Sequence, residues 1–322
     1  MKTAFLFPGQ GAQHVGMGHD VYDKIADGAE FFDRAESATD LPLKKLCFEG
    51  PEEELSRTDI AQPAIFTVSA AMLAARETFL SPEKLESESP AFMAGLSLGE
   101  YTALYAAGAM DFETGVRLVA RRGELMQQAA TSVPSAMVSV LGMDEPKAVE
   151  LCQAAAEGQI LTCANFNCPG QIVLSGEVDA CRRAETMAKD FGASAAIMLK
   201  VAGAFHCQIM APAAEKLADA LDAVEFTAPK VPVIANVDGQ PHGSSDEIKS
   251  KLLAQLTSPV RWQQSMEYLL SQGSDKFYEI GPGKVLAGLM RRIQRRTDFT
   301  CVNSIEALEK LSKTGACEKK EA

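Results

Sequence analysis

The chain has 322 residues, of which 47% are hydrophobic, so it can build one large domain or two unequal ones around a sizeable core. Its formal net charge of −12 argues against non-specific binding to nucleic acid. No stretch approaches the roughly 18 apolar residues of a membrane span, and the amino terminus lacks the features of a signal peptide. The eight cysteines form no CxxC pair and only four histidines accompany them. We therefore expect a cytoplasmic enzyme with reduced thiols and no metal, membrane or nucleic-acid partner.

The first part of the chain reads as alternating strands and helices. A short apolar run at residues 3–7 stops at Pro8-Gly9 and predicts a buried strand. Helical patterns fill residues 20–79, with interruptions expected at Leu41-Pro42, Gly50-Pro51 and Gln62-Pro63. A second strand at 91–94 leads into a helix over 98–107, and Asp111 is placed to cap the helix that ends near Pro134.

Residues 135–201 have shorter and more regular elements in the order strand, helix, strand, strand, helix, strand. A turn at Cys168-Pro169-Gly170 joins the two middle strands as a hairpin. This βαββαβ order is typical of a ferredoxin-like unit. We place this small subdomain at residues 133–202, inserted into a large α/β domain made of 1–132 and 203–312. Residues 313–322 are polar and expected to be disordered.

The candidate nucleophile is Ser97, in the segment Gly95-Leu96-Ser97-Leu98-Gly99 between the second strand and its helix. A G-x-S-x-G turn in this context exposes the serine hydroxyl, and the helix amino terminus favours developing negative charge. The same pattern also occurs as a purely structural turn. A serine needs a base to become nucleophilic, which directs attention to the histidines.

His206 is the best placed of the four histidines, because it follows an apolar strand and a small-residue turn and can reach across a cleft. A lone histidine is more often solvated or packed, so its position alone does not settle its role. The glycine-rich loop at residues 8–13 has two readings, a phosphate cradle or half of an oxyanion hole. It lacks the spacing of either common nucleotide-binding motif.

Taken together, these segments resemble the malonyl-CoA:acyl-carrier-protein transacylases. The matching segments occur in the order of that family and span nearly the whole chain: FPGQGAQ (7–13), DIAQPA (59–64), GLSLGEYTAL (95–104), RRGELMQ (121–127), NFNCPGQIVLSG (165–176), AGAFHCQIM (202–210), SPVRW (258–262) and EIGPGKVL (279–286). The fold class we expect is α/β: a large α/β-hydrolase-like domain with a parallel sheet, plus the inserted ferredoxin-like subdomain.

The resemblance implies a ping-pong transfer in fatty acid biosynthesis. Ser97 takes a malonyl group from malonyl-CoA, His206 acts as the general base, and the phosphopantetheine thiol of an acyl carrier protein then receives the group. It implies no cofactor.

The resemblance also implies roles for six further residues. The backbone carbonyl of Gln255 orients the histidine, and the backbone N–H groups of Gln10 and Leu98 form the oxyanion hole. Arg122 holds the malonyl carboxylate, and an arginine suits this role because its planar guanidinium grips a carboxylate through two hydrogen bonds. The two remaining substrate-binding candidates are Gln62 and Phe205.

The chain departs from the family pattern at three positions. Leu96 stands where a histidine usually precedes the nucleophile, which can alter contacts with the acyl group. Ala202 and Cys207 stand where serine is usual, and Cys207 reads more readily as a packed residue than as an oxidation-sensitive thiol. Bulky Phe205, just before the base, favours malonyl over branched acyl groups.

Several alternatives stay open at this stage. The activity can serve a polyketide pathway instead of fatty acid synthesis, and the less favoured readings are a serine hydrolase and a catalytically silent binding subunit. The basic stretch at residues 291–296 either meets an acidic carrier protein or is a solvated helix end. We expect a monomer.

Overall fold

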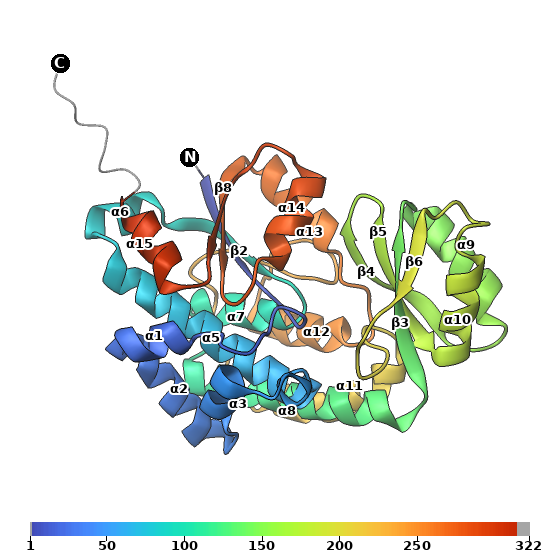
Figure 1. Ribbon diagram of the computed structural model, residues 1–322, viewed down its shortest axis with the longest axis horizontal. Helices are drawn as coiled ribbons and strands as arrows, with labels where there is room; N and C mark the ends of the chain where they lie inside the picture. Colours follow the sequence, from blue (N-terminus) through green and yellow to red (C-terminus); the bar gives the residue numbers. More distant parts are fainter. Residues whose placement is uncertain (1, 314–322) are drawn as a thin grey trace.

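The computed structural model describes residues 2–313 as two units, each built on its own β-sheet (Figure 1). The larger sheet has five parallel strands in the order β7-β2-β1-β8-β9. Their bounds are β1 Lys2–Phe7, β2 Pro90–Gly95, β7 Val233–Ile234, β8 Ser274–Ile280 and β9 Asp298–Val302. Since all five run the same way, the loops after their carboxyl ends meet at one edge of the sheet.

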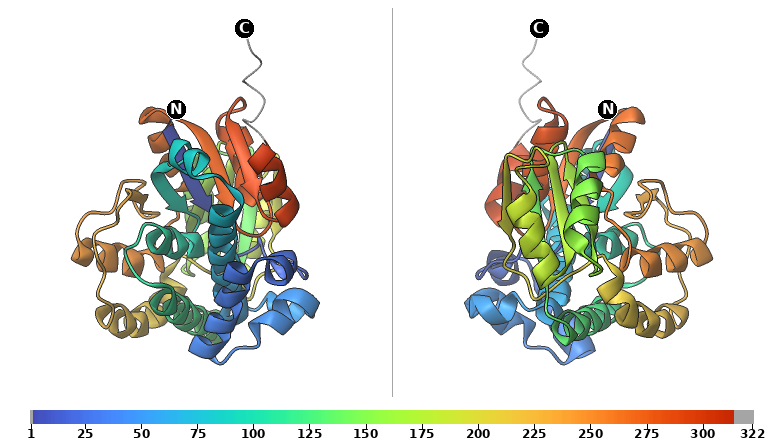
Figure 2. Two further views of the ribbon diagram at one scale, coloured as in Figure 1. Left: turned by 90° about the vertical axis from the view of Figure 1, so that its left-hand side faces the viewer. Right: turned by 90° about the vertical axis from the view of Figure 1, so that its right-hand side faces the viewer.

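Helices cover both faces of the parallel sheet. Figure 2 shows the first helices (blue) and those near residues 211–255 (gold) on opposite sides of the molecule. The helices of this unit are α1 His19–Lys24, α2 Ala26–Thr39, α3 Leu43–Glu49, α4 Glu52–Leu55, α5 Thr58–Phe79, α6 Pro82–Ser87, α7 Leu98–Ala106, α8 Phe112–Ser132, α11 Ala211–Asp222, α12 Ser245–Gln255, α13 Trp262–Ser271, α14 Val285–Ile293 and α15 Ile305–Lys313, with a 3-10 turn η1 at Gln208–Met210.

The smaller unit is an antiparallel sheet in the order β4-β5-β3-β6 with two helices on its outer face (Figure 1). Its elements are β3 Ser135–Leu141, α9 Glu145–Ala156, β4 Leu161–Cys168, β5 Gln171–Glu177, α10 Val178–Met187 and β6 Ala195–Met198. A separate hydrophobic cluster fills it, with Val138, Leu151 and Leu174 fully buried. The mixed α/β fold with one parallel and one small antiparallel sheet is thus confirmed.

The central helix of the large unit is α5, which continues through Pro63 instead of breaking there as predicted. Nearly all of its first fourteen residues are buried against neighbouring helices, and this packing outweighs the local cost of the proline. By length and composition alone α5 could cross a membrane, but 83% of its most apolar window is buried inside this protein. It is the core helix of the larger unit.

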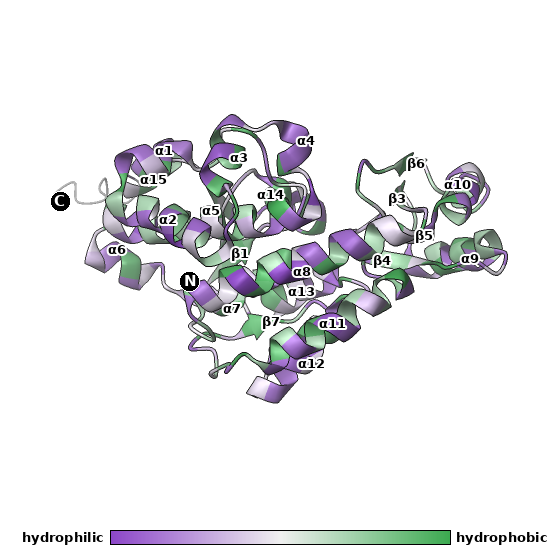
Figure 3. Cartoon of the chain, turned by 90° about the horizontal axis from the view of Figure 1, so that it is seen from below, coloured by the Kyte–Doolittle hydropathy of each residue, from purple (hydrophilic) through white to green (hydrophobic). Residues whose placement is uncertain are grey.

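Helix α8 connects the two units. Figure 3 shows it running below the large unit toward the small sheet, with polar and apolar residues on different faces. Asp111 caps it as predicted, because its carboxylate accepts a hydrogen bond from the Thr114 N–H at 2.7 Å. The helix ends at Ser132, and β3 begins three residues later.

Two elements near the carboxyl end have no counterpart in the sequence-based prediction. Strand β9 extends the parallel sheet beside β8, and α15 packs against β9 and α5. Of the tail predicted to be disordered, only Lys313 falls within the described residues, where it ends α15. Residues 314–322 lie outside them.

Candidate active site

Ser97 occupies the turn between β2 and α7, at the carboxyl edge of the parallel sheet. Its backbone lies at φ 52° and ψ −102°, a positive-φ conformation that residues other than glycine rarely adopt. The flanking glycines make the turn possible. A Cβ on Gly99 would lie 2.1 Å from the Phe7 carbonyl oxygen, and one on Gly95 would lie 1.9 Å from the Gly99 backbone. Small residues at these two positions therefore relieve crowding in the turn.

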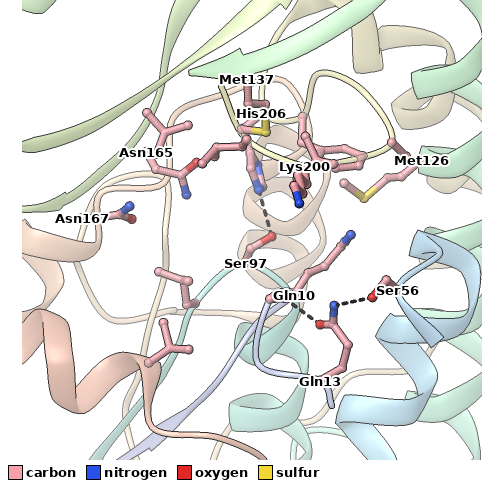
Figure 4. Close-up of a pocket in the computed structure, with 18 of the residues that line it drawn as sticks. Gln10, Gln13, Ser56, Ser97, Met126, Met137, Asn165, Asn167, Lys200 and His206 are labelled. Carbon is pink, nitrogen blue, oxygen red and sulfur yellow. Dashed lines mark hydrogen bonds between the residues drawn. The ribbon is translucent and has the colours of Figure 1, made fainter. Parts of the chain in front are cut away.

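Ser97 and His206, 109 residues apart, meet through a hydrogen bond of 2.8 Å between Oγ and Nε2 (Figure 4). On the other side of the ring, Nδ1 lies 2.7 Å from the Gln255 backbone oxygen. A carbonyl oxygen can only accept, so Nδ1 carries the proton and Nε2 is left as the acceptor. The Ser97 hydroxyl therefore donates to His206, which is the direction that a general base requires.

His206 is held in its neutral form. Burial, and then the nearby charge of Arg122, lower its pKa from 6.5 to about 4, and the hydrogen bond to Gln255 opposes this shift. The residue is only 4% exposed. At neutral pH the imidazole is therefore free to accept a proton.

Arg122 is a buried cation behind the nucleophile, 1% exposed. Its Nη2 donates to Ser97 Oγ at 3.1 Å and to Gln255 Oε1 at 2.8 Å, and its Nη1 donates to Gln62 Oε1 at 2.6 Å. These acceptors are all uncharged, and the Nε–H has no hydrogen-bond partner among the described residues. Burial lowers the pKa of the guanidinium, while the ring of Tyr101 lies 5.2 Å below it.

A cavity of about 660 Å³ opens above Ser97 and His206, between the two sheets. Gln10, from the loop after β1, lines one wall, and Phe205 lines it beside the histidine. Leu98 begins α7, so its N–H has no acceptor within its own helix. Arg122 and Gln62 lie behind Ser97 and do not line the open cavity, although Arg122 contacts the nucleophilic oxygen.

The three departures from the family pattern lie close to the reacting groups. Leu96 lines the cavity and packs against an apolar cluster that includes Leu289 and Trp262. Ala202 also lines the cavity. Cys207 is fully buried and burial raises the pKa of its thiol, so it is a packed residue with little thiolate character.

The basic stretch at residues 291–296 joins the two units. Arg292 donates from Nη1 to Gln171 Oε1 at 3.1 Å and from Nη2 to the Pro169 carbonyl at 3.3 Å, which ties α14 to the β4–β5 turn. Of the four arginines in the stretch, Arg292 therefore has a structural contact with the smaller unit.

Sequence reasoning missed three polar residues that support the nucleophile. Asn236 accepts the Ser97 N–H on its Oδ1 at 2.6 Å. Glu100 and His242 form a fully buried pair, with Oε1 and Nε2 2.8 Å apart. Glu100 follows Ser97 by one helical turn, which was a usable signal, whereas nothing in the local sequence places Asn236 or His242 near it.

Comparison with known proteins fits this geometry. The family model of the acyl transferase domain matches residues 4–312. The malonyl CoA-acyl carrier protein transacylase of Bacillus subtilis is 44% identical over 309 residues, which cover 96% of this chain and 95% of the relative. The chain belongs to the malonyl CoA-acyl carrier protein transacylase family. It is therefore an acyltransferase.

Solved structures of transacylases share the same fold. That of the malonyl CoA-acyl carrier protein transacylase from Coxiella burnetii superposes with a TM-score of 0.92 at 39% identity, covering 97% of each chain. A malonyl-transacylase in complex with a holo acyl carrier protein of type II polyketide synthesis gives a TM-score of 0.89 at 39% identity, covering 96% of this chain and 98% of the other. The transacylase fold thus extends over both units of this chain.

Proposed function

We propose that this acyltransferase moves a malonyl group from malonyl-CoA to the phosphopantetheine thiol of an acyl carrier protein through a malonyl-Ser97 ester. The observation that carries the proposal is the hydrogen bond from Ser97 Oγ to a neutral, oriented His206 beside a buried arginine. The family membership supports the substrate and the carrier protein. The predicted pathway stays fatty acid synthesis.

In the first half-reaction Ser97 Oγ attacks the thioester carbonyl while its proton passes to His206 Nε2. The carbonyl oxygen becomes an oxyanion, for which we propose the backbone N–H groups of Gln10 and Leu98 as donors. Collapse of this intermediate breaks the carbon–sulfur bond, and the proton on His206 passes to the departing CoA sulfur. The Ser97 ester and free CoA result.

The second half-reaction runs the same steps in reverse with a different thiol. The carrier-protein thiol gives its proton to His206 and attacks the ester carbonyl. When the new intermediate collapses, the proton returns to Ser97 Oγ and the malonyl thioester of the carrier protein leaves. His206 needs no acidic partner for this cycle, because the Gln255 carbonyl holds its Nδ1 proton.

Arg122 is the residue proposed to bind the malonyl carboxylate. A buried cation whose hydrogen-bond acceptors are all neutral has no carboxylate in direct contact, and the charge of Glu100 acts on it only from behind Gln255. A malonyl carboxylate would supply this direct contact and also offer an acceptor to Nε. An acetyl group would leave the cation unpaired. Gln62 would then orient the guanidinium, and Phe205 would limit branching at the acyl carbon.

The finer description of the fold belongs to the same proposal. We class the small unit, residues 133–202, as a ferredoxin-like subdomain, which its βαββαβ order and antiparallel sheet support. Residues 1–132 and 203–312 would form the large α/β-hydrolase-like domain. The cytoplasmic location and the monomeric state stay predictions.

The two half-reactions can be separated experimentally. The protein is incubated with malonyl-CoA, freed of small molecules by gel filtration, and then mixed with a holo or an apo acyl carrier protein. We expect the isolated malonyl-enzyme to load the holo carrier and not the apo carrier, which lacks the thiol. Loading that requires malonyl-CoA to be present in the same mixture would contradict the ping-pong mechanism.

A further inference from the structure

Glu100 is a fully buried acid that takes no direct part in the proposed reaction. It lies in the first turn of α7, three residues after Ser97. Its Oε2 accepts from the Asn236 N–H at 2.9 Å and from Gln255 Nε2 at 2.7 Å, and its Oε1 lies 2.8 Å from His242 Nε2. Three donors, two from the loop between β7 and α12 and one from the end of α12, thus converge on one carboxylate, which offsets the cost of burying it.

The first of these donors belongs to the residue that holds the nucleophile. Asn236 follows β7, and its side chain spans the turn: Oδ1 accepts the Ser97 N–H and Nδ2 donates to the Gly95 carbonyl at 2.7 Å. These two bonds fix the strained backbone on which Ser97 Oγ is aimed. Glu100 accepts the Asn236 N–H and so fixes the backbone of the residue whose side chain holds the turn.

The second donor belongs to Gln255, whose polar groups are all engaged around the site. Its backbone oxygen accepts from His206, its Oε1 accepts from Arg122, and its Nε2 donates to the Ser97 carbonyl at 3.0 Å and to Glu100. A reversed amide would point its NH₂ group at the Arg122 guanidinium. The Glu100 carboxylate accepts only from the NH₂ side, so it determines which end of the amide faces Arg122.

We propose that Glu100 is a positioning residue for the transfer reaction, with His242 as its partner. It contacts none of the reacting atoms. Asn236 links it to Ser97, and Gln255 links it to His206 and to Arg122, the proposed ligand of the malonyl carboxylate. His242 Nδ1 has no hydrogen-bond partner among the described residues, so the role of this ring is to hold Glu100 through Nε2. The inference rests on the function proposed above.

The test measures how fast and how completely Ser97 is malonylated in a single turnover. Glu100→Gln keeps the shape but offers one acceptor oxygen to three donors, and Glu100→Ala removes both oxygens. We expect the acylation rate constant to fall about tenfold in the first variant and about 10²-fold in the second, since small misplacements of reacting groups have effects of this size. The fraction of Ser97 that becomes acylated should stay complete, and the preference for malonyl over acetyl should fall.

A matched control separates positioning from general stability. Glu88 is also a buried, ion-paired glutamate, but it lies just before the start of β2, at the edge of the sheet away from Ser97. Glu88→Gln should leave the rate constant and the acyl preference unchanged. If Glu100→Ala fails to fold, Glu100→Gln and His242→Gln test the inference instead. His242 contacts the site through Glu100, so His242→Gln should also slow acylation.

The failure of this inference can be told apart from the failure of the proposed function. A wild-type protein that does not become malonylated overturns the proposed function. A wild type that does, with Glu100→Gln and Glu100→Ala matching its rate constant and acyl preference, overturns only the role of Glu100. An equal fall in Glu88→Gln also overturns it, because the effect would then reflect stability.

Discussion

At the scale of single residues, the site depends on charges placed where water cannot reach them. His206 stays neutral because burial and the charge of Arg122 both disfavour its protonated form. Arg122 in turn meets only neutral acceptors. An acyl group with a carboxylate would complete the ion pair and weaken the repulsion that Arg122 exerts on a protonated His206. Substrate charge and base strength are therefore linked in the proposed mechanism.

Replacing Arg122 by alanine should change acyl selectivity more than any other single substitution. We expect malonyl transfer to fall about 10²–10³-fold, the usual effect of removing one partner of a buried, hydrogen-bonded charge pair. Acetyl transfer should fall less. Initial rates with malonyl-CoA and acetyl-CoA measure the ratio. Arg121→Ala is the matched control, since this neighbouring arginine is exposed and paired with Glu124. An unchanged ratio in Arg122→Ala would remove Arg122 from its assigned role.

The lowered pKa of His206 predicts an unusual pH profile. A histidine with the ordinary pKa of 6.5 would lose its basic form as the pH falls below that value, whereas His206 should stay neutral until the pH approaches about 4. Single-turnover acylation at limiting malonyl-CoA reports His206 of the free enzyme, so after a rapid pH jump its rate should hold across the range around pH 6 and fall only near pH 4. In Arg122→Gln the inflection should move upward. A wild-type inflection near 6.5 would show that the base is not shielded in this way.

The same shift has a consequence for stability, with a sign opposite to that of a histidine in an ion pair. The folded state binds a proton on His206 less readily than the unfolded chain does. Protonation of His206 therefore has no effect on the free energy of unfolding above about pH 6.5. As the pH falls from there toward 4, it progressively lowers that free energy. For this reason the kinetic measurement uses a pH jump and not prolonged incubation in acid.

At the scale of elements, the strand-to-helix turn at Ser97 is the feature on which the others depend. Its glycines were recognisable in the sequence because the G-x-S-x-G pattern requires close backbone approach. The Asp111 cap was equally local and equally predictable. By contrast, α5 passes through Pro63 because buried contacts along its length outweigh a local preference, and β9 is stabilised by pairing with distant β8. Neither effect is visible in a short window of sequence.

Two glycine-to-alanine substitutions should have opposite effects on stability. A Cβ on Gly99 would collide with the Phe7 carbonyl, so Gly99→Ala should lower the free energy of unfolding by about 3 kcal/mol and abolish acylation. Gly288, inside α14, has open space around its Cβ position, and Gly288→Ala should raise the free energy of unfolding by about 1 kcal/mol. Urea denaturation followed by circular dichroism measures both. A tolerated Gly99→Ala would contradict the tight packing of the turn.

At the scale of the whole molecule, the loops after the parallel strands face the antiparallel sheet (Figure 1). The cavity lies between them. Residues from both units line it, for example Ser97 and Gln10 from the larger and Asn165 and Met137 from the smaller. Backbone hydrogen bonds between β4 and Val260, together with the contact of Arg292 to the β4–β5 turn, join the two units in this arrangement. An acyl group on Ser97 would therefore lie between the two sheets.

Much of the order of elements could be predicted from local periodicity and turn chemistry, although β9 and α15 of the larger unit were missed. The candidates Ser97 and His206 could be named from their sequence contexts, but their meeting at 2.8 Å depends on the sheet topology. Glu100, Asn236 and His242 could not be assembled into a network beforehand. Glu100 lies in α7 and the other two in the loop between β7 and α12, and only tertiary packing brings Asn236 and His242 onto its carboxylate.

The most direct test of the proposed function is the intact mass of the protein after brief mixing with malonyl-CoA. We predict an increase equal to one malonyl group on the wild type, located on Ser97 by peptide mapping. Ser97→Ala should show no increase under the same conditions. A wild type without the adduct, or an equal adduct on Ser97→Ala, would contradict the assignment of Ser97 as the nucleophile.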